Sequence, residues 1–195
     1  FASLKDRAIS AETAKKYGVK VVYDSQGAIA QHVYPYFIKH ELTANKIRYT
    51  RDKKFLCQGQ IQGTGLFGQH LFKEGGKFLT ITEGEVDAMS AYELMGSKWA
   101  CVSIKRGASS AVKDVKENLE YVESFDNIVI CFDEDDVGRK SAEQVAELFG
   151  GKAKIMRHPK DYKDACDYLK ANQQALFVST WWKAEKYIPD GIVVS

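Results

Sequence analysis

Residues 77–104, KFLTITEGEVDAMSAYELMGSKWACVSI, carry the clearest fold signal in this chain. They predict an apolar, β-branched strand over 77–82, a helix over 86–95 that ends at Gly96, and a second apolar strand over 99–104. Strands that are apolar along their whole length and separated by helices indicate a parallel sheet covered on both faces. We therefore expect an α/β arrangement around this stretch.

The same alternation continues to residue 170. A polar loop follows the second strand, and apolar runs alternate with helical patterns from there on. We expect these elements in the order helix 110–123, strand 127–132, helix 139–149, strand 153–156 and helix 161–170. The sequence therefore predicts a parallel-sheet unit over residues 77–170, followed by a C-terminal helix and the start of a linker over 171–195.

The upstream residues 1–76 have a different pattern. Runs of β-branched and aromatic residues are separated there by residues 24–27 (DSQG), which are typical of a hairpin loop. We expect a helix at 11–17, strands at 19–23, 29–37 and 46–50, and a loop-rich connection at 57–76. This part is therefore predicted to be a smaller unit of mixed α+β structure.

Charge is distributed unevenly along the chain, although its net charge is only +2. Residues 1–80 hold 13 Lys+Arg and 6 Asp+Glu, whereas residues 81–195 hold 15 and 20. A basic half joined to an acidic half indicates a nucleotide or an anionic polymer near the first and metal-binding carboxylates in the second. Two solvated faces are the alternative explanation on charge alone.

Composition excludes several classes of protein. With 45% hydrophobic and 28% charged residues the chain is of ordinary globular composition, and no apolar run approaches the roughly 20 residues of a membrane span. Because the first residue is Phe1, we expect the numbering to begin inside a longer protein. The cysteines form no CxxC pair, which predicts no zinc in this chain and a reducing compartment; they are Cys57, Cys101, Cys131 and Cys166.

Acidic residues gather where the predicted parallel strands end. Glu83 follows the first strand, Asp133 and Asp135 follow the third, and Asp164 comes after the fourth. Ligands bind beyond the carboxyl ends of such strands, and converging carboxylates repel one another unless a cation neutralises them. Mg²⁺ prefers oxygen ligands, and two such ions about 4 Å apart can activate a hydroxyl and stabilise a leaving pyrophosphate.

Helix capping is the alternative role for acidic residues at strand ends. We favour it for Glu85, Asp136 and Asp161. Capping is the weaker explanation for the carboxylates that directly follow the first and third strands, because all of them fall at the same end of one sheet. Which of Asp161, Asp164 and Asp167 supplies the carboxylate after the fourth strand stays open at this point.

A dense cationic stretch, residues 48–55 (RYTRDKKF), lies in the basic half. Bases can stack on its two aromatic rings while its cations hold phosphates; a solvated edge strand protected by lysines is the alternative. Lys105 and Arg106 fill a loop at the same end of the sheet as the acidic residues and are further candidates for phosphate contact. The chain contains neither a Walker A loop nor a GxSxG motif, and its four histidines lack the spacing of metal ligands.

Two motifs resemble the signature of TOPRIM domains, a fold shared by primases, topoisomerases and some nucleases. They are residues 81–87 (ITEGEVD) and 131–140 (CFDEDDVGRK). The spacing from Asp133 to Gly138 is similar to that of the primase branch, with Ser141 as a mild departure from the motif's closing small residue. The resemblance implies a TOPRIM-type parallel-sheet subdomain over 77–170, preceded by the smaller basic mixed α+β subdomain.

Segments in the upstream half, with two more further along the chain, resemble the bifunctional primase–helicases of short-tailed T-odd phages. The matching segments are residues 46–48 (KIR), 51–55 (RDKKF), 66–68 (LFG), 107–109 (GAS) and 188–191 (IPDG). The resemblance covers most of the chain from residue 46 onward and is looser before it. It implies a DNA primase, a nucleotidyltransferase that makes short RNA primers on single-stranded DNA during phage DNA replication.

The resemblance also implies roles for individual residues. Glu83 would be the catalytic carboxylate and a metal ligand, Asp133 and Asp135 would hold two Mg²⁺ ions, which Mn²⁺ can replace, and Asp164 would be a further ligand. Lys46 and Lys53 would contact nucleotide phosphates or the template. The residues Arg48, Lys105 and Arg106 are added to this binding set on charge and position alone.

The same resemblance implies partners and leaves alternatives open. A zinc-binding module precedes the primase domain in that family and a hexameric helicase follows it. Single-stranded DNA, ribonucleoside triphosphates and the replicative DNA polymerase are the further partners expected, in the cytoplasm of an infected bacterial host. A catalytically inactive DNA-binding and assembly module is one alternative, and a TOPRIM nuclease that uses the same carboxylates is the other.

Overall fold

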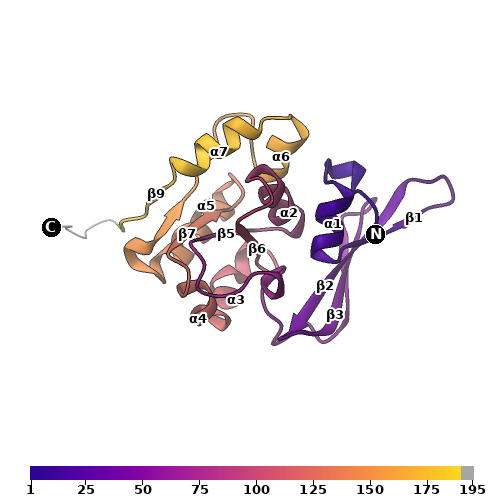
Figure 1. The fold of residues 1–195 in the computed structure, drawn as a ribbon, viewed down its shortest axis with the longest axis horizontal. Helices are drawn as coiled ribbons and strands as arrows, with labels where there is room; N and C mark the ends of the chain where they lie inside the picture. The colour runs from indigo at the N-terminus through magenta and orange to yellow at the C-terminus, as the bar shows by residue number, and fades with distance from the viewer. Residues whose placement is uncertain (190–195) are drawn as a thin grey trace.

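The computed structural model describes residues 1–189, which form two sheets side by side (Figure 1). The first sheet is antiparallel throughout, with its strands in chain order. It consists of β1 (Lys20–Tyr23), β2 (Ile29–Ile38), β3 (Glu41–Tyr49) and β4 (Lys54–Gly59). Helix α1 (Ala11–Tyr17) begins at Ser10, whose hydroxyl accepts a hydrogen bond from Thr13 N, and ends at Gly18.

The second sheet has the strand order β6-β5-β7-β8-β9. It consists of β5 (Phe78–Thr82), β6 (Ala100–Ser103), β7 (Asn127–Cys131), β8 (Ala153–Ile155) and β9 (Glu185–Lys186). The first four strands are parallel, which confirms the predicted parallel sheet. β9 pairs antiparallel with β8, and its two exposed residues carry no sequence pattern that predicts a strand.

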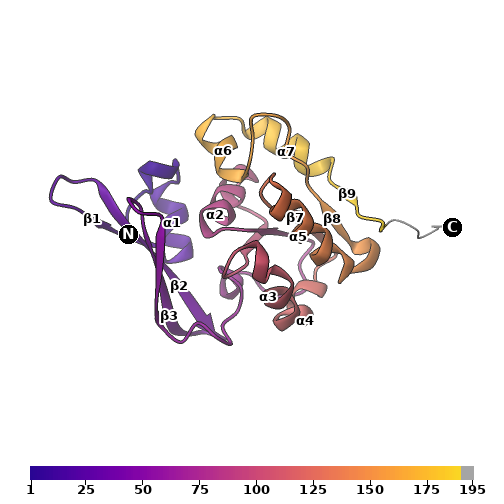
Figure 2. The same cartoon turned by 180° about the vertical axis from the view of Figure 1, so that it is seen from behind.

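Helices cover both faces of the second sheet (Figures 1 and 2). Buried side chains of α2 (Glu85–Leu94), α6 (Ala165–Lys170) and α7 (Gln174–Trp182) pack against one face. Those of α3 (Ala111–Glu117), α4 (Leu119–Glu123) and α5 (Asp136–Glu147) pack against the other. Four short 3₁₀ turns complete the described secondary structure: η1 (Lys5–Arg7), η2 (Gln69–Leu71), η3 (Ala108–Ser110) and η4 (Gly150–Lys152).

Two predictions of secondary structure are wrong. The single helix expected over 110–123 divides at Asn118, whose side-chain amide donates to the backbone carbonyl of Asp114 and so competes with helical bonding. The loop-rich segment expected over 57–76 begins inside β4, an edge strand in which every residue is exposed. An edge strand without a buried face has no alternating pattern by which to recognise it.

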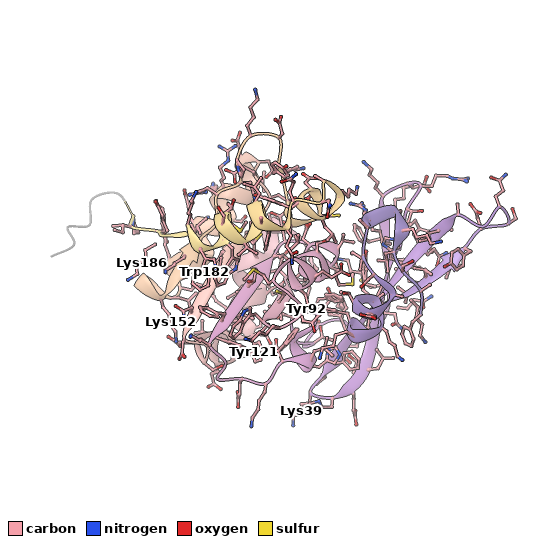
Figure 3. All side chains as sticks on the ribbon, turned by 45° about the horizontal axis from the view of Figure 1, so that its top comes forward. Lys39, Tyr92, Tyr121, Lys152, Trp182 and Lys186 are labelled. Carbon is pink, nitrogen blue, oxygen red and sulfur yellow. The ribbon has the colours of Figure 1, made fainter. Side chains whose placement is uncertain are left out.

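A shared hydrophobic cluster joins the two sheets. Tyr17, Tyr34 and Phe67 from the N-terminal part pack with Val86 and Met89 of α2. The Tyr17 hydroxyl donates to the carbonyl of Cys101 at 2.7 Å, and its ring lies 5.6 Å from that of Tyr92, which Figure 3 labels on α2. The two sheets are therefore held together by buried contacts.

The C-terminal part contains α7 as expected. Trp181 is buried and its indole N–H donates to the Thr80 hydroxyl at 2.9 Å, whereas Trp182, labelled in Figure 3, is 61% exposed. The end of the expected linker, residues 190–195, lies outside the described residues. Among residues 1–189, the helices are too short or too polar to cross a membrane.

Candidate active site

Three aspartates meet at the carboxyl ends of the parallel strands. Asp87, Asp133 and Asp164 each offer a carboxylate oxygen, and these oxygens all lie within 4.8 Å of one another. They come from the first turn of α2, the chain just after β7 and the residue that caps α6. The structure thus brings together two of the predicted site residues and one that was not predicted.

The local sequence explains why each carboxylate points inward. Asp164 accepts a hydrogen bond from Asp167 N at 3.0 Å and so starts α6, while Asp87 accepts one from Cys166 N at 3.2 Å. Gly138 lets α5 approach the chain at Asp133, because a Cβ atom at residue 138 would lie 2.2 Å from the carbonyl oxygen of Asp133. This contact explains the glycine of the motif.

Glu83 stands beside this triad. Its Oε1 atom is buried without a hydrogen-bond partner, and so is Oδ1 of Asp133. Burial raises the pKa of Glu83, and the charge of Asp135 raises it further. A buried carboxylate oxygen without a donor is costly, so an unpartnered pair of them indicates a position for a positive ligand.

The triad itself holds protons more tightly than ordinary aspartates do. Burial, followed by the charges of Glu83 and Asp164, raises the pKa of Asp133 to about 7. Burial also raises the pKa of Asp87 well above its usual value, with Asp164 and Asp133 adding to the effect. The pKa of Asp164 is raised by burial and by Asp167. The four carboxylates are therefore unfavourable together in the charged form.

These residues fit a hard divalent cation. The donors are carboxylate oxygens from separate elements, which is the ligand type that Mg²⁺ and Mn²⁺ prefer. The unpartnered oxygens of Glu83 and Asp133 are two further ligand atoms that such an ion could use. The chemistry of the site thus supports divalent metal binding, as the sequence led us to expect.

Asp135 occupies a different position from its neighbour Asp133. Its Oδ1 atom accepts a hydrogen bond from Gly138 N at 2.7 Å and caps α5, while Oδ2 lies 3.6 Å from the Lys163 ammonium. The charge of Asp133, aided by that of Asp135, raises the pKa of Lys163. Asp135 therefore borders the triad and is not one of its three members in this structure.

The carboxylates left open after the fourth strand are now placed. Asp164 belongs to the triad, whereas Asp161 is exposed in a left-handed turn (φ +76°). Asp167 accepts a hydrogen bond from Lys163 N at 2.8 Å on the first turn of α6. Sequence reasoning passed over Asp87, and its signal was its position in the first turn of the helix that directly follows β5.

The capping role expected for Asp136, Asp161 and Glu85 is wrong, because the side chains that cap α5 and α6 are those of Asp135 and Asp164 and α2 has no side-chain cap. Glu85 is buried, accepts a hydrogen bond from the Tyr36 hydroxyl at 2.9 Å, and forms an ion pair with Lys46 at 2.8 Å. Lys46 also donates to the carbonyl of Lys105 at 2.8 Å and lies over the ring of Phe55. The bridge therefore links β2 and β3 to the start of α2.

The other predicted basic residues differ in exposure. Lys53 is exposed in the β3–β4 turn, and Arg48 is half-buried with Nε unpartnered. Arg106 is exposed and pairs with the buried Asp114 at 3.3 Å. Lys105 is 1% exposed and donates to the carbonyl of Thr64 at 3.0 Å, so it is an interior residue and not the exposed loop cation that its position suggested.

Comparison with known proteins places the chain in a family. It is similar to the crystal structure of the primase fragment of the bacteriophage T7 primase–helicase protein, at 32% identity and a TM-score of 0.83, over 93% of this chain and 74% of that one. The chain belongs to the primase domains of phage primase–helicases. Residues 80–169 of this primase domain also match the Toprim-like family model.

Two further relatives support the assignment. The primase domain is 33% identical to the DNA helicase/primase of Enterobacteria phage T3 over 99% of its own length, and spans 33% of that relative. It is also similar, at 32% identity and a TM-score of 0.85, to a chain in the structure of T7 lagging-strand DNA polymerase interacting with primase domains of two gp4 subunits bound to an RNA/DNA hybrid and dTTP. That match covers 96% of this chain and 93% of the other.

The raised carboxyl pKa values predict how the stability of the metal-free primase domain depends on pH. The pKa of Asp133 is about 7 when folded, against about 4 for an unfolded aspartate. The folded state therefore binds more protons between these values, so its stability falls as the pH rises through them. We expect the melting temperature in EDTA to drop by about 5 °C between pH 5 and pH 8.

Asp87→Asn is the variant that checks this cause. The asparagine removes one titrating group whose pKa is raised by burial, and it keeps an oxygen for the Cys166 N–H. The fall in melting temperature should therefore be smaller in the variant. An equal fall in both proteins would show that the cluster does not produce the pH dependence.

Proposed function

We propose that this domain is a DNA primase that synthesises short RNA primers on single-stranded DNA by template-directed nucleotidyl transfer. The observation that carries the proposal is the pair of buried, unpartnered oxygens on Glu83 and Asp133 beside an aspartate triad, in a chain of the primase family. Phosphoryl transfer depends on positioning and on electrostatic stabilisation, and the carboxylate cluster is built to hold positive charge.

The carboxylates of this cluster would have different roles according to their positions. Asp87, Asp133 and Asp164 would hold one divalent ion, and Asp135, once released from Lys163, would help to hold a second. When bound, Mg²⁺ or Mn²⁺ would polarise phosphoryl oxygens and lower the pKa of the attacking hydroxyl. The buried Oε1 of Glu83 is available to accept the proton of a primer 3′-hydroxyl, because no other group in residues 1–189 bonds to it.

Basic residues of the first sheet and of the loop after β6 would bind phosphates. Lys53 and Arg106 are exposed and can reach a phosphate directly, whereas the half-buried Arg48, whose Nε is itself buried, would contribute its positive charge. The ion pair with Glu85 already fixes the Lys46 side chain. Its positive charge would therefore be in position before the nucleotide binds. Lys105 would act through its backbone carbonyl, which fixes the Lys46 ammonium.

The proposal includes partners and a setting. The substrates are ribonucleoside triphosphates and a single-stranded DNA template, in the cytoplasm of an infected bacterium. In a full-length protein a zinc-binding module and a hexameric helicase would accompany this domain. The T7 structure with a lagging-strand DNA polymerase and primase domains supports the replicative polymerase as a further partner.

Ribonucleotide addition to a short RNA on a single-stranded DNA template tests the proposal. We expect Mg²⁺-dependent extension that stops in EDTA and falls by about 10²-fold or more in Glu83→Gln, which keeps the size of the side chain and removes its charge. Full synthesis by Glu83→Gln would refute the assignment. Metal-dependent cutting of DNA without any extension would favour a nuclease, and template binding without either reaction would favour an inactive binding module.

A further inference from the structure

His158 connects two of the three segments that carry the aspartate triad, those of Asp133 and Asp164. It follows β8 and is 7% exposed. Its Nε2 atom lies 3.1 Å from the carbonyl oxygen of Phe132, and its Nδ1 atom lies 2.9 Å from the hydroxyl of Tyr168 on α6. Because a carbonyl oxygen only accepts, Nε2 carries the proton, and Nδ1 accepts from the hydroxyl.

The backbone around Asp133 is held on both sides by the segment between β8 and α6. On one side the Phe132 carbonyl accepts from His158, and on the other the Glu134 N–H donates to the carbonyl of Lys163 at 2.8 Å. The segment that supplies both bonds ends at Asp164. These bonds therefore fix the position of Asp133 relative to Asp164.

We infer that His158 is a positioning residue that sets the separation of Asp133 and Asp164, and thereby the affinity of the cluster for a divalent cation. The inference rests on the metal-binding role proposed above for these carboxylates and not on the polymerase reaction. Partners that orient ligating groups typically change metal affinity by about 10–100-fold when they are lost. Tyr168 has a supporting part, since its hydroxyl, on a fully buried side chain, holds the other ring nitrogen.

Direct titration of the folded protein with Mn²⁺, followed by calorimetry below its melting temperature, tests this role. We expect His158→Leu to bind Mn²⁺ about tenfold more weakly than the parent. His158→Gln can still donate to the Phe132 carbonyl and is expected to keep the affinity of the parent. Tyr168→Phe removes only one hydroxyl and can be measured even if His158→Leu does not fold. It should lower the affinity for Mn²⁺ about threefold.

His32 provides a matched control. It is also buried and also has two side-chain partners, the Tyr34 hydroxyl at 2.9 Å and Asp6 at 3.0 Å, but it lies in the first sheet. His32→Leu should lose thermal stability and keep the Mn²⁺ affinity of the parent. The inference is overturned if His158→Leu or Tyr168→Phe behaves like His32→Leu, or if the parent binds no Mn²⁺. A parent that binds Mn²⁺ but makes no primer would refute the proposed function alone.

Discussion

Asp133→Asn is expected to lower the rate of primer synthesis by about 10³-fold or more and, at the same time, to make the metal-free protein more stable. Both effects have one cause. Burial and the charges of Glu83 and Asp164 penalise the ionised Asp133, and the same ionised oxygens are what a divalent cation requires. Near pH 8 the variant should gain about 1–3 kcal/mol in free energy of unfolding, because the penalised charge is absent.

Two measurements on the same preparations check these effects. Thermal unfolding in EDTA tests the expected gain in stability, and primer extension in Mg²⁺ tests the expected loss of activity. The control is Glu134→Gln, which changes the adjacent acid, outside the triad, whose nearest cation is Arg139 at 3.9 Å. That variant should keep most of its activity and change little in stability. An Asp133→Asn protein that loses stability and activity in parallel would show that Asp133 has a structural role instead.

Gly138→Ala is expected to destabilise the domain by about 2–4 kcal/mol and to weaken Mn²⁺ binding. The added methyl group would lie 2.2 Å from the carbonyl oxygen of Asp133 and 3.1 Å from Oδ1 of Asp135. The nearest of these atoms belongs to the backbone, so no rotation of a side chain relieves the contact. Either α5 or the chain at Asp133 must move, and both movements disturb the cluster.

Gly151→Ala is the matched control for this substitution. A Cβ atom there would meet only the far end of the flexible Lys186 side chain, at 3.8 Å. We expect its stability to stay within about 0.5 kcal/mol of the parent, as measured by thermal or urea unfolding. If Gly138→Ala matched Gly151→Ala in stability and in Mn²⁺ affinity, the close approach at Asp133 would not constrain the site.

The parallel sheet was predictable from sequence because its strands are buried on both faces. The segments 78–82 and 127–131 are rich in apolar and β-branched residues and buried almost throughout, and a helix follows each of them. Asp133 and Asp164 could be placed near one another for the same reason, since the carboxyl ends of parallel strands meet at one edge. Two of the three triad residues could therefore be predicted from the order of strands and helices along the chain.

The remaining features depend on contacts between distant parts of the chain. The partners of Glu85 are Tyr36 and Lys46, which lie 49 and 39 positions upstream, and nothing in the residues near Glu85 indicates them. Asp87 belongs to the triad only because α2 begins directly after β5, which places the first turn of this helix beside Asp164. Local patterns identify capping and strand ends, but they do not specify such pairings.

The cluster that joins the two sheets has a consequence for any attempt to divide the molecule. A cut at residue 76 would follow the change in charge and composition along the chain, yet it would strip Tyr17, Tyr34 and Phe67 from α2. Val86 and Met89 would then face water, and the separated piece would present an adhesive apolar surface. The smallest part that can be inherited, transplanted or expressed intact is therefore the pair of sheets together.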